Sequence, residues 1–290
     1  MEFLSGAIWL PFIGAVLHPF LSHAIQRSAK AGARPTDITC LSNLLSVSIF
    51  LLFLRPTGGW TLQGVDFLAI AAGAGFFLGQ WFSVQSVKSG DIAVHSSAMG
   101  LKLILLAALS FLVGLEELSW PLLGGVILAV LAVYLVAGAS LAGWKEHRNT
   151  VFLTLAACVF FGLTDFMTGW QSVQIGGQRW LVLMMASCGL LSLTLLLARS
   201  AALPGTLLRP AALRPALLAG LIFGSQALIV NIAFTRYQEP TLSNVVYSSR
   251  GLLAVLFLWW LHRKTNPRFR GSQLAGALLM MLSLALVLLA

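Results

Sequence analysis

Long apolar stretches alternate with short polar gaps along the whole chain, and this alternation limits what the chain can fold into. Each stretch runs for roughly 18–24 residues with almost no charge, which is the length of helix that crosses the hydrocarbon core of a bilayer. Of 290 residues, 58% are hydrophobic and only 9% are charged, a balance that a bilayer tolerates and water does not. Because backbone polar groups in lipid must be paired within the protein, the stretches are predicted to be helices. We therefore expect an all-α integral membrane protein.

The pattern predicts ten transmembrane helices in two groups of five. A polar stretch at residues 143–150 separates the fifth helix from the sixth, which divides the chain into units 1–146 and 147–290. The first stretch contains Pro11 and Pro19 and is too long for a cleaved signal peptide. The predicted spans are 6–25, 37–54, 65–87, 92–114, 119–142, 151–172, 180–198, 211–236, 241–262 and 271–290.

The basic residues are distributed unevenly between the two ends of the predicted helices. The chain has a net charge of +9, and 13 of its 18 Lys and Arg residues lie in odd-numbered loops, against 3 in even-numbered loops. The positive-inside rule places the odd loops in the cytoplasm and both termini outside it, in what we expect to be a bacterial inner membrane. Nucleic acid is not an expected partner, because no soluble basic module is present. The 13 residues are Arg27, Lys30, Arg34, Lys88, Lys145, Arg148, Arg199, Arg209, Arg214, Arg263, Lys264, Arg268 and Arg270.

The two halves resemble each other when the first is shifted by 151 positions. Small residues then coincide in the same order along both halves. Because each half has an odd number of helices, the second would enter the membrane in the opposite orientation, as an inverted repeat of the kind found in secondary transporters. The coinciding pairs are Gly73 with Gly224, Ser97 with Ser248, Gly100 with Gly251 and Gly125 with Gly276.

Local sequence also resembles a known family. An acidic turn, Leu115-Glu116-Glu117-Leu118-Ser119, precedes the glycine-bearing helix start Leu123-Gly124-Gly125-Val126-Ile127-Leu128, and Leu274-Ala275-Gly276-Ala277-Leu278-Leu279 is close to the same start. With ten helices in two halves, these segments are similar to the drug/metabolite transporter superfamily, and most to its EamA-type branch. The resemblance implies a metabolite carrier with a central cavity between the halves.

Strongly polar residues deep in the predicted helices are the candidates for function, because each costs several kcal/mol in lipid unless it faces a cavity or a partner. His18 lies beside Pro19 in the first helix, and Asp165 lies deep in the sixth. Asp165 is our candidate for proton coupling. The structural alternatives are a histidine bonded to a neighbouring helix and a carboxylate paired only for packing.

The fourth and ninth predicted helices supply the candidate cations. His95, Met99 and Lys102 follow i, i+4, i+7 spacing, which places them on one face, with Ser97 nearby. The ninth helix carries Asn244, Tyr247 and Arg250. If both helices line one cavity, Lys102 and Arg250 would bind a carboxylate or phosphate there. The competing interpretation pairs Arg250 with Asp165 and Lys102 with a carbonyl, which leaves the site neutral.

Amide and aromatic residues complete the expected binding site. Gln80 and Asn231 coincide at the 151-residue shift and are assigned to the cavity, whereas Gln226 is interpreted as a bond between helices. Trp81 and Tyr247 are expected to cover an apolar part of the substrate.

These residues favour a secondary transporter that moves a small anionic or zwitterionic metabolite, such as an amino acid, with protons as a candidate co-substrate. The expected partners are that substrate and membrane lipid, in a monomer or weak dimer. We expect no cofactor and no metal, and Cys40, Cys158 and Cys188 are interpreted as apolar packing residues. The alternatives are a flippase for a lipid or lipid-carrier phosphate and an integral membrane enzyme, although recognisable catalytic motifs are lacking.

Overall fold

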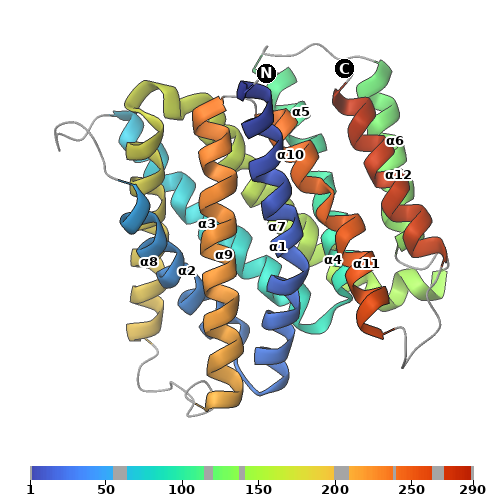
Figure 1. Ribbon diagram of the computed structural model, residues 1–290, viewed down its shortest axis with the longest axis horizontal. Helices are drawn as coiled ribbons and strands as arrows, with labels where there is room; N and C mark the ends of the chain where they lie inside the picture. Colours follow the sequence, from blue (N-terminus) through green and yellow to red (C-terminus); the bar gives the residue numbers. More distant parts are fainter. Residues whose placement is uncertain are drawn as a thin grey trace.

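The computed structural model describes residues 2–54, 64–113, 120–136, 141–198, 209–237, 240–262 and 271–288. Within these ranges the secondary structure is helical and contains no strand, so the all-α prediction is confirmed for the described chain. Both termini lie at the same end of the bundle (Figure 1). The helices are α1 Glu2–Lys30, α2 Pro35–Phe53, α3 Gly64–Ser89, α4 Ile92–Ala98, the 3₁₀ turn η1 Met99–Leu101, α5 Lys102–Leu112, α6 Trp120–Val136, α7 Leu141–Ile175, α8 Gly177–Ala198, α9 Pro210–Tyr237, α10 Pro240–Ser248, α11 Arg250–His262 and α12 Gly271–Leu288.

Seven of the described helical stretches are long and apolar enough to cross a membrane. Three shorter apolar helices, within α4–α5, α6 and α12, coincide with the remaining predicted spans. The outer surface carries large apolar side chains, such as Leu52 at 77% exposed and Phe152 at 68% exposed. Many polar side chains are buried instead, among them Asn43 and Thr154, which are fully buried. This distribution reverses that of a water-soluble protein and is typical of a protein surrounded by lipid.

Turn chemistry explains where several helices begin and end. Gly32 has a φ of 100° after α1, and Gly176 has a φ of 84° between α7 and α8. Both backbones adopt the left-handed conformation in which a residue with a Cβ is strained. The α2 helix begins with Pro35, whose missing N–H is not needed in a first turn. At α4, the side chain of Asp91 accepts a bond from the Ala93 N–H at 2.7 Å.

The helices differ from the predictions at three places. The stretch 143–150 is predicted to be a polar break, but it belongs to α7, a single helix of 35 residues. Its Lys, Glu and Arg residues are good helix formers, so their polarity marks departure from the apolar region and not the end of the helix. Conversely, the predicted spans 92–114 and 241–262 are each interrupted, by η1 and at Ser249. Gly100 lies within η1 and Gly251 lies two residues after Ser249, and glycine lowers helix propensity.

Side-by-side packing of helices from distant parts of the sequence holds the bundle together. Helix α1 packs along α9, and α3 packs along α7. Helix α2 contacts both α8 and α9, and α6 pairs with α12 at one edge (Figure 1). At the opposite end from the α1–α2 turn, Arg179 of α8 donates two bonds to Asp66 of α3, at 3.0 and 2.6 Å.

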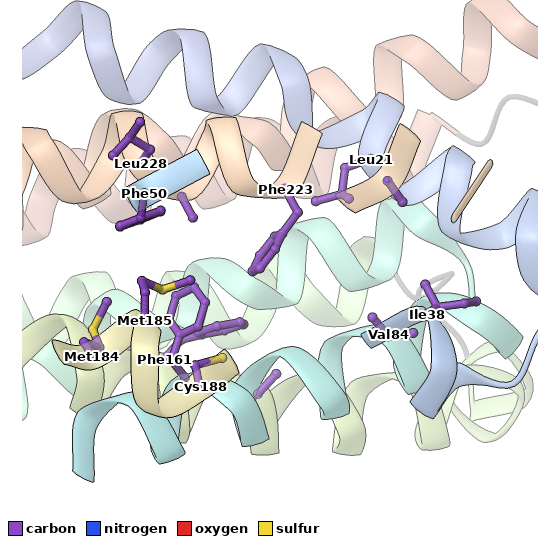
Figure 2. Packing of buried hydrophobic residues seen from close by; sticks show 14 of the residues in the cluster. Leu21, Ile38, Phe50, Val84, Phe161, Met184, Met185, Cys188, Phe223 and Leu228 are labelled. Carbon is purple, nitrogen blue, oxygen red and sulfur yellow. The ribbon is translucent and has the colours of Figure 1, made fainter. Parts of the chain in front are cut away.

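The larger apolar core lies between α2, α3, α7, α8 and α9 (Figure 2). Phe50 is fully buried there, and Phe161 and Phe223 meet Phe76 with ring centroids 5.4 and 5.6 Å apart. Cys188 belongs to the same core, and all three cysteines are buried and not joined by disulfides, in agreement with their interpretation as packing residues. Close packing also explains Gly73, where a Cβ would lie 2.0 Å from the carbonyl oxygen of Met184.

Candidate functional site

A small cavity lies inside the bundle, between helices of both halves. Its volume is about 60 Å³, well below the roughly 300–1,000 Å³ of a pocket for a drug-sized ligand. Its lining combines apolar and aromatic side chains with amides, a histidine and three charged groups. The lining residues are His18, Leu21, Phe76, Gln80, Ser83, Met99, Lys102, Phe161, Asp165, Phe223, Gln226, Ala227, Val230, Asn231, Tyr247 and Arg250.

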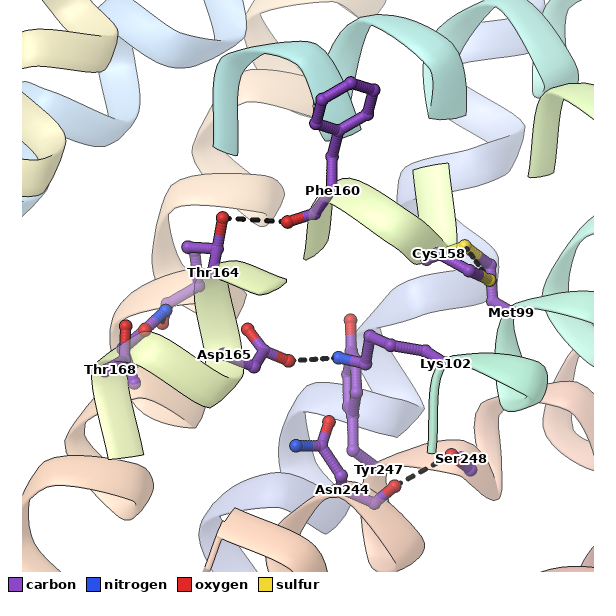
Figure 3. Close-up of polar contacts among 12 residues, drawn as sticks. Met99, Lys102, Cys158, Phe160, Thr164, Asp165, Thr168, Asn244, Tyr247 and Ser248 are labelled. Atoms are coloured by element: carbon purple, nitrogen blue, oxygen red, sulfur yellow. Dashed lines mark hydrogen bonds and ion pairs between the residues drawn. The ribbon is translucent and has the colours of Figure 1, made fainter. Parts of the chain in front are cut away.

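An ion pair joins two of the charged groups. The Lys102 Nζ, in the first turn of α5, donates to Oδ2 of Asp165 in the middle of α7 (Figure 3). Lys102 is 4% exposed and Asp165 is 5% exposed, so water does not screen the pair. Each ion compensates the cost of burying the other, and removal of either would leave a buried charge. The pairing differs from the competing sequence interpretation, in which Arg250 was the partner of Asp165.

Arg250 is the third charged group, and no carboxylate neutralises it within the described part of the chain. It is the first residue of α11, is 2% exposed, and its guanidinium lies 4.1 Å from the centroid of the Tyr247 ring. Its hydrogen bond to the carbonyl oxygen of Met99 is long, at 3.5 Å. With Lys102 and Asp165 cancelling each other, the cavity carries one uncompensated positive charge.

Hydrogen bonds connect Tyr247 of α10 to α9 and α1. The Gln226 Nε2 donates to the Tyr247 hydroxyl and lies 3.5 Å from Nδ1 of His18. Four buried polar atoms of the cavity lining have no hydrogen-bond partner among the residues that the structure describes, namely His18 Nε2, Gln80 Nε2, Gln226 Oε1 and Arg250 Nε. Buried polar groups in folded proteins are normally paired, so their concentration around one cavity indicates a site for a polar ligand or water.

Eight of the twelve predicted site residues line this cavity. They are His18, Gln80, Met99, Lys102, Asp165, Asn231, Tyr247 and Arg250. Asn231 is also bonded to its own helix, through the carbonyl oxygen of Ala227 at 2.8 Å. The structure thus brings together the deep charged residues and the amide pair Gln80 and Asn231.

The other four predicted residues, Trp81, His95, Ser97 and Asn244, are not part of the cavity wall. Trp81 points toward α2, where its Nε1 lies 3.4 Å from the Thr36 hydroxyl. Ser97 lies in the tight contact between α4 and α11, where a Cβ on Gly251 would be 3.1 Å from its Cα. Asn244 is fully buried next to Tyr247 (Figure 3).

Met99 and Lys102 line the cavity, whereas His95 lies directly behind its wall. The His95 ring stacks on that of His18, with the centroids 5.9 Å apart, and its Nε2 lies 3.4 Å from the Ser83 hydroxyl. Its Nδ1 lies 3.1 Å from the hydroxyls of both Ser86 and Thr154.

Sequence reasoning missed most of the apolar wall and assigned Gln226 to helix packing. A helical projection would have found them, because Phe223, Gln226, Ala227, Val230 and Asn231 follow i, i+3, i+4, i+7 and i+8 spacing on one face of α9. Phe76, Gln80 and Ser83 do the same on α3. Among the described residues, no three His, Cys, Asp or Glu side chains are grouped to hold a metal ion.

No family model matches the chain, and no curated protein sequence matches it. Solved structures do match. One, described only as a "crystal structure of protein", superposes with a TM-score of 0.62 over 98% of this chain and 97% of its own. The two sequences are 17% identical, so the likeness shows a shared fold over the whole chain and nothing about activity.

Proposed function

We propose that this protein is a secondary transporter for a small polar metabolite with an anionic or zwitterionic end. The observation that carries the proposal is a cavity enclosed within an apolar bundle and lined by buried charges from both halves of the chain. Ionisable residues inside membrane proteins are costly and mark substrate or ion pathways. The family resemblance to drug/metabolite transporters of the EamA type supports the same proposal.

Packing between the halves supports ten membrane passes arranged as an inverted repeat. In such a repeat α1 corresponds to α7, α2 to α8, α3 to α9 and α6 to α12. Each contact should then have a counterpart when the halves are exchanged, so that α1–α9 matches α7–α3 and α2–α9 matches α8–α3. All four of these pairs are in contact, as is α6–α12, which corresponds to itself. The repeat-related glycines follow the same exchange, since Gly73 of α3 packs on α8 and Gly224 of α9 packs on α2.

The interrupted helices fall at corresponding places in the two halves. At the 151-residue shift, Met99 in η1 corresponds to Arg250 at the start of α11. Lys102 and Arg250 are both the first residues of the helical segments that follow the interruptions. Discontinuous helices that meet at a midplane site are a recurring feature of secondary transporters, in which the two repeats rock to open the site to one side at a time.

The charge and size of the cavity favour a small monoanion or zwitterion, with an amino acid as the leading candidate. The guanidinium of Arg250 would hold the carboxylate by two parallel bonds, a geometry that Lys cannot offer. Phe76, Phe161 and Phe223 would contact an apolar part of the substrate. Because the cavity holds only about 60 Å³, the halves must separate to admit even a small metabolite.

Asp165 is the proposed proton-coupling residue, acting through its bond to Lys102. Protonation of Asp165 would break the ion pair and release the lysine toward the substrate. The double variant Lys102→Met with Asp165→Asn removes the pair without leaving an unpaired charge. Its transport in liposomes should no longer respond to an imposed pH gradient, and a wild-type response would exclude this coupling role.

A ligand screen by thermal unfolding of the purified protein tests the proposal as a whole. Amino acids, sugar phosphates, nucleotides and choline-like cations would be compared, because binding to the folded state raises its apparent stability. We expect a small carboxylate compound to stabilise the wild type and to be taken up by liposomes in exchange for itself. Stabilisation only by a lipid-linked phosphate would favour a flippase, and chemical conversion of a ligand would favour an enzyme.

A further inference from the structure

A second site lies on the outer face of the bundle, where α1 and α9 run side by side (Figure 1). An open groove of about 780 Å³ follows the two helices. Leu17 and Phe20 of α1 and Leu218 and Ile222 of α9 line its apolar part. None of the residues that line the groove lines the central cavity. The groove is therefore a distinct feature that faces the surrounding lipid.

One end of the groove is basic. Arg27 lies in the last turn of α1, Arg214 lies just inside the start of α9, and both are exposed. Neither takes part in an ion pair within the described ranges, and the groove lining contains no acidic residue. The start of α9 and the end of α1 carry opposite partial charges, so the attraction for an anion at this end comes from the two arginines.

The length of the groove matches one leaflet of a bilayer. From Arg27 to Leu17 the α1 helix advances ten residues, or about 15 Å at 1.5 Å per residue. The hydrocarbon core of a bilayer is about 30 Å thick, so the apolar part of the groove reaches about as deep as one layer of acyl chains. The two arginines then lie at the level of the phosphates.

We propose that this groove binds one molecule of a two-chain anionic phospholipid. Its phosphate lies between Arg27 and Arg214, and an acyl chain follows Leu17, Phe20, Leu218 and Ile222. Basic pockets between membrane helices are suited to anionic headgroups, because each nearby Arg attracts them and the chain keeps its apolar surroundings. The site depends on the membrane location of the chain and not on the proposed transport activity.

Lipid binding to the full-length protein, counted by native mass spectrometry from mixed micelles, tests the proposal. The probes are phosphatidylglycerol and phosphatidylcholine with the same chains, and the test variant is Arg27→Gln with Arg214→Gln. Phosphatidylglycerol affinity should fall about fivefold for each arginine and about thirtyfold for the pair, while phosphatidylcholine binding is unchanged. The matched control, Lys30→Gln with Arg148→Gln, removes the same charge from exposed positions outside the groove lining and should change either affinity less than twofold.

A third variant separates the acyl chain from the headgroup. Leu218→Trp places a bulky side chain in the groove and should weaken both lipids, with no change in the melting temperature of the delipidated protein. Equal losses in the test and control pairs would mean general surface attraction and would overturn the proposal. So would full displacement of phosphatidylglycerol by water-soluble glycerol phosphate, or wild-type binding to the Leu218→Trp variant.

Discussion

The buried pair Lys102 and Asp165 makes a prediction with a magnitude that can be worked out. In Lys102→Met, the Asp165 carboxylate is left in a site that is 5% exposed. In Asp165→Asn, the Lys102 ammonium is left without its partner in a site that is 4% exposed. Breaking a buried ion pair by removing one partner costs about 3–5 kcal/mol, because the remaining charge is buried and uncompensated. Each single variant should therefore lose about 3–5 kcal/mol of unfolding free energy.

Denaturant unfolding of the purified protein measures these differences. The double variant Lys102→Met with Asp165→Asn leaves neither member of the pair unpartnered and should lie within about 1 kcal/mol of the wild type. Additive losses in the double variant would refute the reasoning. A loss below about 1 kcal/mol in Lys102→Met would also refute it, because Arg250 would then have replaced Lys102 as the partner of Asp165.

Three further predictions concern the substrate, the topology and the packing. Arg250→Gln should weaken substrate binding by about 1.5–3 kcal/mol, at least tenfold, without lowering the stability of the unliganded protein, whereas Arg250→Lys should lose less binding free energy. Equal substrate binding by the wild type and both variants would show that Arg250 does not contact the substrate. Single cysteines placed at 27–34 and at 263–270 should resist an impermeant thiol reagent added outside intact cells, and labelling of both would reverse the predicted orientation. Gly73→Ala should lower the melting temperature, because the new Cβ would lie 2.0 Å from a backbone oxygen, whereas the control Gly64→Ala, whose Cβ meets nothing within 4 Å, should leave it unchanged. Equal melting temperatures of the two variants would show that α3 and α8 can move apart.

Much of the site could be predicted from the sequence alone, because a polar residue deep in a membrane helix is costly and therefore rare. His18, Lys102, Asp165 and Arg250 stand out in apolar stretches, and all four line the cavity. The aromatic part of the lining was not predicted, since Phe76, Phe161 and Phe223 are distinguished from other apolar residues only by their helical spacing from polar residues of the cavity. The polar break at 143–150 was wrong because polarity and helix termination are separate properties, and α7 continues through it.

The sequence by itself determined that the chain is helical and membrane-embedded, because both follow from local composition and length. Only the tertiary structure decided that Lys102, and not Arg250, is the ion-pair partner of Asp165. That choice depends on how α5, α7 and α11 are rotated about their axes. Helix rotation is fixed by packing between segments far apart in the chain, which no local pattern contains.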